Sequence, residues 1–501
     1  MSTDMNRRID QLFREVADKG LSRRQMIQRA AVMGISASAL TVAFVGKAHE
    51  AVAQGAENPL GVDPTAPLDV VIFKGGYGDD YAINVNDNIW GALYPDSEVT
   101  YSGTQRLQEQ YQSRVVEGSP PDVMDNSGAG NFNTTSLVND GQLADLSDLM
   151  AAPAHGQEGV TFADSLALGS QADGVFDGTQ YVLKYVNGVY GIWYNTTLFD
   201  EKGWTYPETW DDFIAMCQTI KDEGEMAPFT YQGIYPYYIR AVFDQLVFKS
   251  GGWEAQLKLD NIEADAWTQP VVKTALDAIQ TLWNEEYILE GTEGLSHTES
   301  QTAWIEGEAV FLPCGSWLEN EMKDLLAELP EFQMRVMPVP SLTAEDALPF
   351  TAIQASAGED FIVFSQGANV QGGKEYLRLL FSQEGGRFFS EATKSLTVVN
   401  GAADGLDLGT AFASVNDAIT NAGEDTFVSR WGGWYADLDE ISQTSFNELM
   451  TGVKTSDEVI TAMQAKVDEI RDNPEIPKFT ATAPGAAGAT PEASPVATPA
   501  S

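Results

Sequence analysis

Hydrophobic positions recur with two different spacings along the chain. A short apolar run at 67–73 ends in a glycine-rich stretch, and similar runs return at 188–193, 309–313 and 361–364. The segments between them carry apolar residues three and four positions apart, which places those residues on one face of a helix. Strands alternating with helices along most of the chain predict two α/β lobes.

Three helices have recognisable boundaries. The first follows Thr209, which stands three residues before Asp212 as in a capping box, and Gly224 closes it. The same logic predicts helices over 270–283 and over 455–473, where a proline follows the last position. The residues expected to face inward are Trp210, Phe213, Ile214, Cys217 and Ile220, then Val271, Ala275, Leu276, Ile279 and Leu282, and finally Val459, Met463 and Val467.

The two ends of the chain differ from the body. Arg23 and Arg24 precede an uncharged run at 30–46, and Ala51-Val52-Ala53 offers a small-x-small cleavage site. This pattern predicts that 1–53 is a twin-arginine export signal. No cysteine follows the run, so a lipid anchor is not expected. The tail at 481–501 is rich in Ala, Pro, Thr and Gly and is expected to be disordered.

The net charge of the chain limits the kinds of ligand and macromolecule that it is expected to bind. The chain has 501 residues, too many for one hydrophobic core, and holds 73 acidic against 29 basic side chains, a net charge of −44. Such a field repels nucleic acid and disfavours phosphorylated or carboxylated ligands. A neutral ligand or a cation is therefore expected.

Catalytic and metal-binding motifs are missing from the sequence. It contains no His-Glu-x-x-His, Cys-x-x-Cys or Gly-x-Ser-x-Gly. His49 lies in the leader, and His155 and His297 stand in polar surroundings typical of the surface. Cys217 and Cys314 can pair only if the fold brings them together, and the apolar neighbourhood of Cys217 favours a buried free thiol. No cofactor and no metal site is predicted.

Short motifs follow one another in a characteristic order between 67 and 473. The stretches are 118–123 with a Gly-x-x-Pro-Asp-Val turn, 143–146, 177–181, 191–195, 203–210 with Pro-x-Thr-Trp, and 307–317 with a Gly-x-Trp ending. Together they resemble the large solute-binding proteins of ABC carbohydrate importers. Further stretches at 71–81, 235–238, 300–304 and 315–321 resemble the branch that binds N-acetylglucosamine or diacetylchitobiose.

The resemblance implies a bilobal, type 2 periplasmic-binding-protein-like fold whose chain crosses a hinge more than once. The first lobe is expected over 67–185 plus 355–425, and the second over 190–350 plus 430–473. A small sugar would bind in the cleft between them, and hinge closure would create the form that a membrane permease recognises. The implied protein is not an enzyme; it is a monomer on the outer face of the cytoplasmic membrane or in the periplasm.

A pyranose ring needs aromatic planes for its C–H face and planar polar groups for its hydroxyls. Trp317 resembles the family's cleft tryptophan, and Trp434 with Tyr435 resembles a later aromatic pair, a role for which Trp431 competes. The full set of candidate ligand-binding residues is Trp317, Trp434, Tyr435, Tyr237, Tyr238, Asp79, Asp80, Asp125, Asn126, Glu319 and Asn320. The first four polar residues follow predicted strands, where ligand sites of α/β folds gather.

Two other functions stay open at this point. A secreted glycoside hydrolase needs only two carboxylates about 5–10 Å apart, and nothing in the sequence selects a pair. A binding protein for a cation such as a polyamine suits the acidity, although Asn126 and Asn320 are unusual in a box of carboxylates.

Overall fold

One long sheet runs through the molecule. The computed structural model describes residues 58–128, 130–167, 170–176 and 178–483. In this part of the chain, nine strands form a sheet in the order β2-β1-β3-β10-β6-β8-β7, with β11 beside β10 and β9 beside β6. The strands are β1 (Leu68–Phe73), β2 (Val99–Thr104), β3 (Val123–Asp125), β6 (Val182–Asn195), β7 (Ala227–Phe229), β8 (Ala309–Gly315), β9 (Met334–Met337), β10 (Ile353–Val363) and β11 (Thr426–Phe427).

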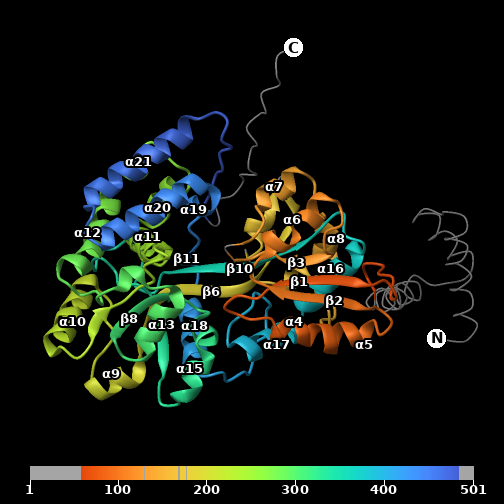
Figure 1. Cartoon of the computed structure of the whole chain (residues 1–501), viewed down its shortest axis with the longest axis horizontal. Helices are drawn as coiled ribbons and strands as arrows, with labels where there is room; N and C mark the ends of the chain where they lie inside the picture. The colour runs from red at the N-terminus through yellow and green to blue at the C-terminus, as the bar shows by residue number, and fades with distance from the viewer. Residues whose placement is uncertain (1–57, 129, 168–169, 177, 484–501) are drawn as a thin grey trace, which may run out of the picture.

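Helices gather around the two ends of this sheet and leave β6 and β10 to connect them (Figure 1). The two strands run antiparallel, with register from Gln354 opposite Tyr190 to Ile362 opposite Val182. Leu183 of β6 is buried in the core of one end, and Trp193 of the same strand is buried in the core of the other. The predicted bilobal α/β architecture with a hinge of crossing strands is confirmed.

The first lobe packs helices on both faces of β1, β2 and β3, which run parallel to one another. Its main helices are α4 (Asp80–Asn84), α6 (Leu107–Val116), α7 (Thr134–Asn139), α8 (Ser147–Ala151), α16 (Val370–Leu380) and α17 (Gln383–Thr393). Apolar residues of β1 point to opposite faces in turn, so that Val70 and Ile72 enter one core and Val71 enters another.

The second lobe holds the predicted amphipathic helices. Its helices are α9 (Thr196–Lys202), α10 (Trp210–Glu223), α11 (Tyr237–Asp260), α12 (Pro270–Asn284), α13 (His297–Ile305), α14 (Leu318–Glu321), α15 (Lys323–Glu328), α18 (Thr410–Ala422), α19 (Trp431–Trp434), α20 (Ala436–Met450) and α21 (Ser456–Asp472). Cys217 and Cys314 are both buried free thiols, so they form no disulfide with each other.

Local signals set the ends of these helices where the sequence predicted. Thr209 caps α10 by accepting a hydrogen bond from the Asp212 backbone N–H, and Gly224 ends it in the left-handed conformation at φ 71°. Thr455 and Glu458 form a complete capping box at the start of α21. Of the residues expected to face inward, Ile214 and Val271 pack only part-buried against the core.

The packing of one segment, α18, favours a different boundary between the lobes. The prediction placed 355–425 in the first lobe, whereas α18 packs on β9 and shares a core with Trp193 and Leu312. Figure 1 shows α18 beside α15, among the second-lobe helices. The apolar face of α18 offers no sign of which sheet end it covers, because both ends are apolar. We therefore propose a first lobe that ends before α18.

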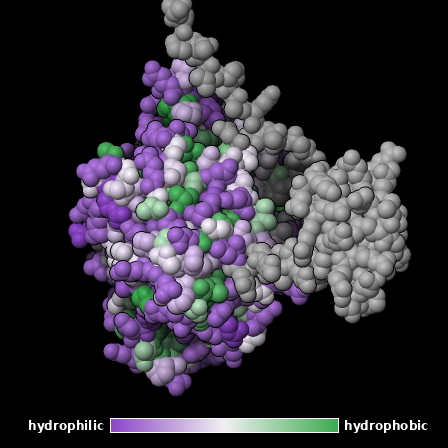
Figure 2. Space-filling view, turned by 90° about the vertical axis from the view of Figure 1, so that its right-hand side faces the viewer, coloured by the Kyte–Doolittle hydropathy of each residue, from purple (hydrophilic) through white to green (hydrophobic). Residues whose placement is uncertain are grey.

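The predicted leader at 1–53 and most of the tail at 481–501 lie outside the described residues. Within the described part, no helix combines the length and the apolar character needed to cross a membrane. Figure 2 views the first-lobe end of the molecule, where hydrophobic residues are scattered in small groups among hydrophilic ones on the visible face. This polar face agrees with the acidic composition.

Candidate functional site

Four aromatic side chains meet where the lobes join. Trp317 stands at the start of α14, and its ring lies edge-on to Tyr190 of β6 with centroids 5.2 Å apart. Tyr238 is tilted to the same indole at 6.2 Å and stacks on Tyr237 at 4.2 Å. Three of the predicted residues are thus together, and Tyr190 is an addition that the sequence did not single out.

The glycine-rich loop of the first lobe closes on this aromatic group. A Cβ atom at Gly76 would lie 3.4 Å from Trp317, which is van der Waals distance, so the two segments are in direct contact. The Asn320 side chain donates to the Gly76 carbonyl oxygen at 2.5 Å. Burial raises the pKa of Tyr77, which also hydrogen-bonds to Ser316 of the second lobe. The predicted residue Asn320 therefore holds the lobes together directly.

We call the face of the crossing strands beneath these aromatics the junction face; it consists of Gly188 and Tyr190 of β6 and Gln354 and Ser356 of β10. Gln354 is opposite Tyr190 and Ser356 is opposite Gly188, and side chains of opposed residues share a face. Residues 354–360 are all half-buried, whereas 361–364 are fully buried. The sheet is thus least covered where it passes between the lobes.

Two amide oxygens near the junction face have no hydrogen-bond partner within the described residues. They are Oε1 of Gln354 and Oε1 of Gln245 from α11, both buried. Gln245 itself is 1% exposed, and its Nε2 donates to the Tyr190 carbonyl oxygen at 3.1 Å. Buried polar atoms are usually paired, so these acceptors mark a place where donors are missing.

Two carboxyl groups approach each other beside the junction face. Asp125, at the end of β3, is fully buried, accepts a hydrogen bond from Tyr81 at 3.4 Å and another from Ser127. Its carboxyl hydrogen-bonds to that of Glu359. Burial raises the pKa of Asp125, and the Glu359 charge raises it further. Burial also raises the pKa of Glu359 to about 7. Adjacent buried carboxylates resist ionising together, so the pair retains protons that exposed acids lose.

Asp79 and Asp80 were predicted to contact a ligand. Asp79 is only 4% exposed; it forms an ion pair with Lys74 at 2.8 Å and accepts a hydrogen bond from the Tyr101 hydroxyl at 2.9 Å. Asp80 is exposed in the first turn of α4. The Asp79 carboxyl is therefore bound to partners within the first lobe, and Asp80 faces solvent.

Three more predicted residues are engaged within their own lobes. The Asn126 amide bonds at both ends to the Phe132 backbone, at 2.8 and 3.0 Å, and so shapes a first-lobe loop. Trp434 stacks on Phe479 at 5.4 Å, and the Tyr435 hydroxyl accepts the Phe479 backbone N–H at 3.1 Å. In this structure the aromatic pair fixes the segment that follows α21.

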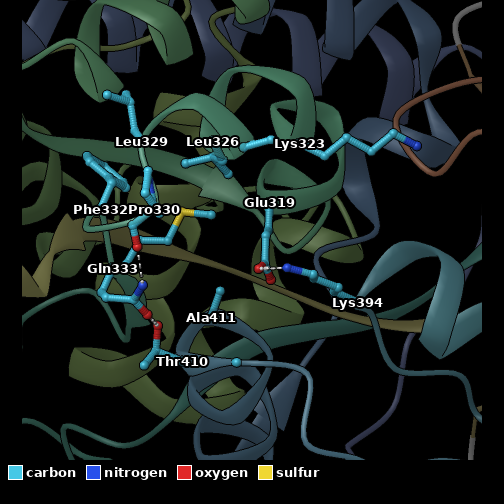
Figure 3. A pocket seen from close by; sticks show the side chains of 13 residues that line it. Glu319, Lys323, Leu326, Leu329, Pro330, Phe332, Gln333, Lys394, Thr410 and Ala411 are labelled. Carbon is cyan, nitrogen blue, oxygen red and sulfur yellow. Dashed lines mark hydrogen bonds and ion pairs between the residues drawn. The ribbon is translucent and has the colours of Figure 1, made fainter.

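Glu319, the last predicted residue, joins the lobes by an ion pair with Lys394 at 2.8 Å, and Arg430 makes a second such bridge to Asp173 at 3.1 Å. Figure 3 shows Glu319 and Lys394 pointing toward each other at a cavity of about 320 Å³. Burial raises the pKa of Glu319. The lining residues are Glu319, Lys323, Leu326, Ala327, Leu329, Pro330, Phe332, Gln333, Met334, Lys394, Gly409, Thr410 and Ala411.

Sequence reasoning missed Tyr190, Gln354 and Glu359. Tyr190 stood in a run that indicated a strand and nothing more. Glu359 left a usable signal, because Gly358 and two acids interrupt the strand directly before the apolar run at 361–364. A glycine and charges inside a strand pattern indicate a local distortion of the strand or the close approach of another group.

Comparison with known proteins gives consistent relationships. A family model described as bacterial extracellular solute-binding protein matches residues 67–387. The diacetylchitobiose binding protein NgcE of Streptomyces coelicolor is 33% identical over 428 residues, which cover 85% of this chain and 89% of that protein. A chitin oligosaccharide binding protein has a TM-score of 0.64 at 18% identity, and the solute-binding protein RafE in complex with raffinose has 0.63 at 17%. Each alignment covers 81% of this chain and 99% of the other, and shows the same fold.

Proposed function

The chain belongs to the family of bacterial extracellular solute-binding proteins, and we propose that the solute it captures is an N-acetylglucosamine oligosaccharide, with diacetylchitobiose as the first candidate. The observation that carries this proposal is the 33% identity along 85% of the chain to a diacetylchitobiose binding protein. As the carbohydrate-binding component of an ABC importer, the protein passes its sugar to a membrane permease.

The chemistry of the lobe junction supports a sugar. Trp317 and Tyr190 offer aromatic surfaces for the apolar face of a pyranose ring. The side-chain oxygens of Gln354 and Gln245 have no hydrogen-bond donor in the described part of the chain. The hydroxyl and acetamide N–H groups of a bound sugar are donors that would complete them. A ligand that satisfies both lobes at once stabilises the closed arrangement, which is the form a permease would recognise.

A glycoside hydrolase is the less suitable alternative. Asp125 and Glu359 are a carboxyl pair beside the junction face, and they hydrogen-bond to each other. Hydrolases hold their two carboxyls at least about 5 Å apart, so that the scissile bond fits between them. We therefore propose a binding protein without turnover.

The remaining aspects of the proposal follow from the family and the charge. We propose that the protein acts outside the cytoplasmic membrane as a monomer, and its net charge of −44 repels nucleic acid. A polyamine is disfavoured because the buried carboxyl pair retains a proton and offers less negative charge than two free acids.

Calorimetric titration tests the proposal. The purified protein is titrated with diacetylchitobiose, N-acetylglucosamine, maltose and spermidine, and the sugar is analysed afterwards by chromatography. We expect saturable binding of the acetylated sugars without cleavage, weakened roughly ten- to a hundredfold in Trp317→Ala because the stacking surface is lost. Binding of spermidine alone, or hydrolysis of the disaccharide, would contradict it.

A further inference from the structure

Glu359 has an unusual position on the hinge strand. Its neighbours Gly358 and Asp360 pair with Val186 and Lys184, while Glu359 itself has no partner residue in the β6 register. Its backbone adopts φ 53°, a left-handed conformation that is uncommon for a residue with a side chain. The register is the same on both sides, so no residue is inserted, and the distortion is confined to Glu359, whose carboxyl meets that of Asp125.

The Glu359 carboxyl is only partly satisfied. One side of it hydrogen-bonds to Asp125 and Ser127. The other oxygen, Oε2, is buried and has no partner among the described residues. The nearly inaccessible Gln245 leaves a second acceptor in the same condition at Tyr190. In the described part of the chain, β10 and α11 thus each carry a buried acceptor oxygen that has no donor.

The groups that face the Glu359 carboxyl set its charge. They come from several elements: Asp125 at the end of β3 and Ser127 just after it, Asp360 and Lys184 on the crossing strands, Tyr77 and Tyr81 from the segment around α4, and Tyr190 of β6. Burial raises the pKa of both carboxyls, and the two titrate as one coupled pair. Because burial raises the pKa of Glu359 to about 7, the pair gains negative charge as the pH rises through that value.

We propose that Glu359 is a ligand-binding and specificity-determining residue, whose free oxygen accepts a hydrogen bond from a hydroxyl or acetamide N–H of the captured sugar while Asp125 donates to its other oxygen. This inference rests on the proposed function and identifies a residue that recognises the hydrogen-bond donors of the sugar. Hydrogen bonds to a carboxylate are roughly twice as strong as those to a neutral acceptor. A ligand without a donor at this point leaves a buried charge unpaired, which costs more than the bond itself.

A pH series of calorimetric titrations on the full protein tests the inference. The unchanged protein is expected to bind diacetylchitobiose more tightly as the pH rises from 6 to 8, because deprotonation of Glu359 creates the stronger acceptor. Glu359→Gln keeps the shape and an acceptor oxygen but carries no charge. It is expected to match the unchanged protein at pH 6, to bind roughly three- to tenfold more weakly at pH 8, and to show little pH dependence.

Glu359→Ala removes the acceptor and is expected to weaken binding roughly ten- to a hundredfold at pH 8. Glu424→Gln, the same change at an exposed position, is the matched control and should keep the pH dependence of the unchanged protein. Retention of that pH dependence in Glu359→Gln, or unchanged affinity in Glu359→Ala, would overturn the inference while leaving the proposed function intact.

The two proposals fail in different ways. If the unchanged protein prefers another sugar, the same variants are titrated with that sugar, and the ligand assignment alone is wrong. Absence of binding to every sugar would overturn the proposed function and this inference with it. A purely structural role for Glu359 would lower the melting temperature of the ligand-free variants without altering the pH dependence of affinity.

Discussion

Two buried carboxyl sites in the first lobe have opposite surroundings. Glu375 of α16 is fully buried against Arg378, which donates to both of its oxygens at 2.7 Å, and Tyr94 adds a third hydrogen bond at 3.1 Å. Glu359 shares its burial with another acid and keeps an oxygen without a partner. A carboxylate whose bonds are complete serves the fold, whereas one that lacks a donor at the lobe junction is poised for a ligand.

The largest expected effect comes from breaking the complete site. Glu375→Ala leaves the Arg378 guanidinium buried without its counter-charge, and we expect a loss of about 3–5 kcal/mol in the free energy of unfolding. Urea denaturation measures this loss. Sugar affinity of the folded variant should stay within a factor of two of the unchanged protein, because the pair lies inside one lobe. Replacing both residues by leucine should recover most of the stability; a single variant that loses under 1 kcal/mol would contradict this account.

Substitution of Glu359, whose hydrogen bonds are incomplete, is expected to change the free energy of unfolding by a smaller amount and to increase it. The pKa of Glu359 is raised to about 7 by burial, so the folded state favours the protonated acid. Its contribution to stability is present below the unfolded pKa of about 4.3 and is lost as the pH rises through 7. Glu359→Gln removes this loss. The ligand-free variant should gain about 1–3 kcal/mol over the unchanged protein between pH 4.5 and 7.5.

Urea denaturation at several pH values without sugar measures that difference. Glu424→Gln is again the control, and its stability relative to the unchanged protein should not depend on pH. A Glu359→Gln variant that is less stable at pH 7.5 by as much as Glu375→Ala would show that the two carboxyls play the same structural role.

The smallest effect is expected at the ion pair beside the cavity. Lys394 has a side chain that is 48% exposed, and pairs of this kind contribute about 0–1 kcal/mol. Lys394→Ala should therefore change sugar affinity by less than about fivefold, with the change decreasing at high salt. Titration at two salt concentrations checks this. A loss as large as that of Trp317→Ala would make the cavity in Figure 3 part of the sugar site.

Features that depend on neighbours in the sequence were predictable. The capping box of Thr455 and Glu458, the glycine at 224 and the proline at 270 each fix a helix end within a few residues, and all three helices have the predicted starts. The family resemblance implied the two-lobed fold and pointed to Trp317 and Tyr237, whereas Asp125 was predicted from its place after a strand; all three lie at the lobe junction.

Features that depend on distant partners were not predictable. The left-handed backbone at Glu359 matters only because β3 places Asp125 at the same point, and no local spacing encodes that contact. Trp434 has the flat aromatic ring that stacks on sugars, yet Phe479 covers one of its faces. The lobe that α18 covers follows from side-chain packing rather than from its own amphipathic pattern. For every candidate residue, contact with a ligand stays a prediction.

A crystal structure of the protein with diacetylchitobiose tests the central claim most directly. The account predicts a sugar ring against Trp317, with a hydroxyl or acetamide nitrogen within about 3 Å of Glu359 Oε2. A disaccharide bound elsewhere, such as in the cavity beside Lys394, with Glu359 still unpartnered, would contradict it.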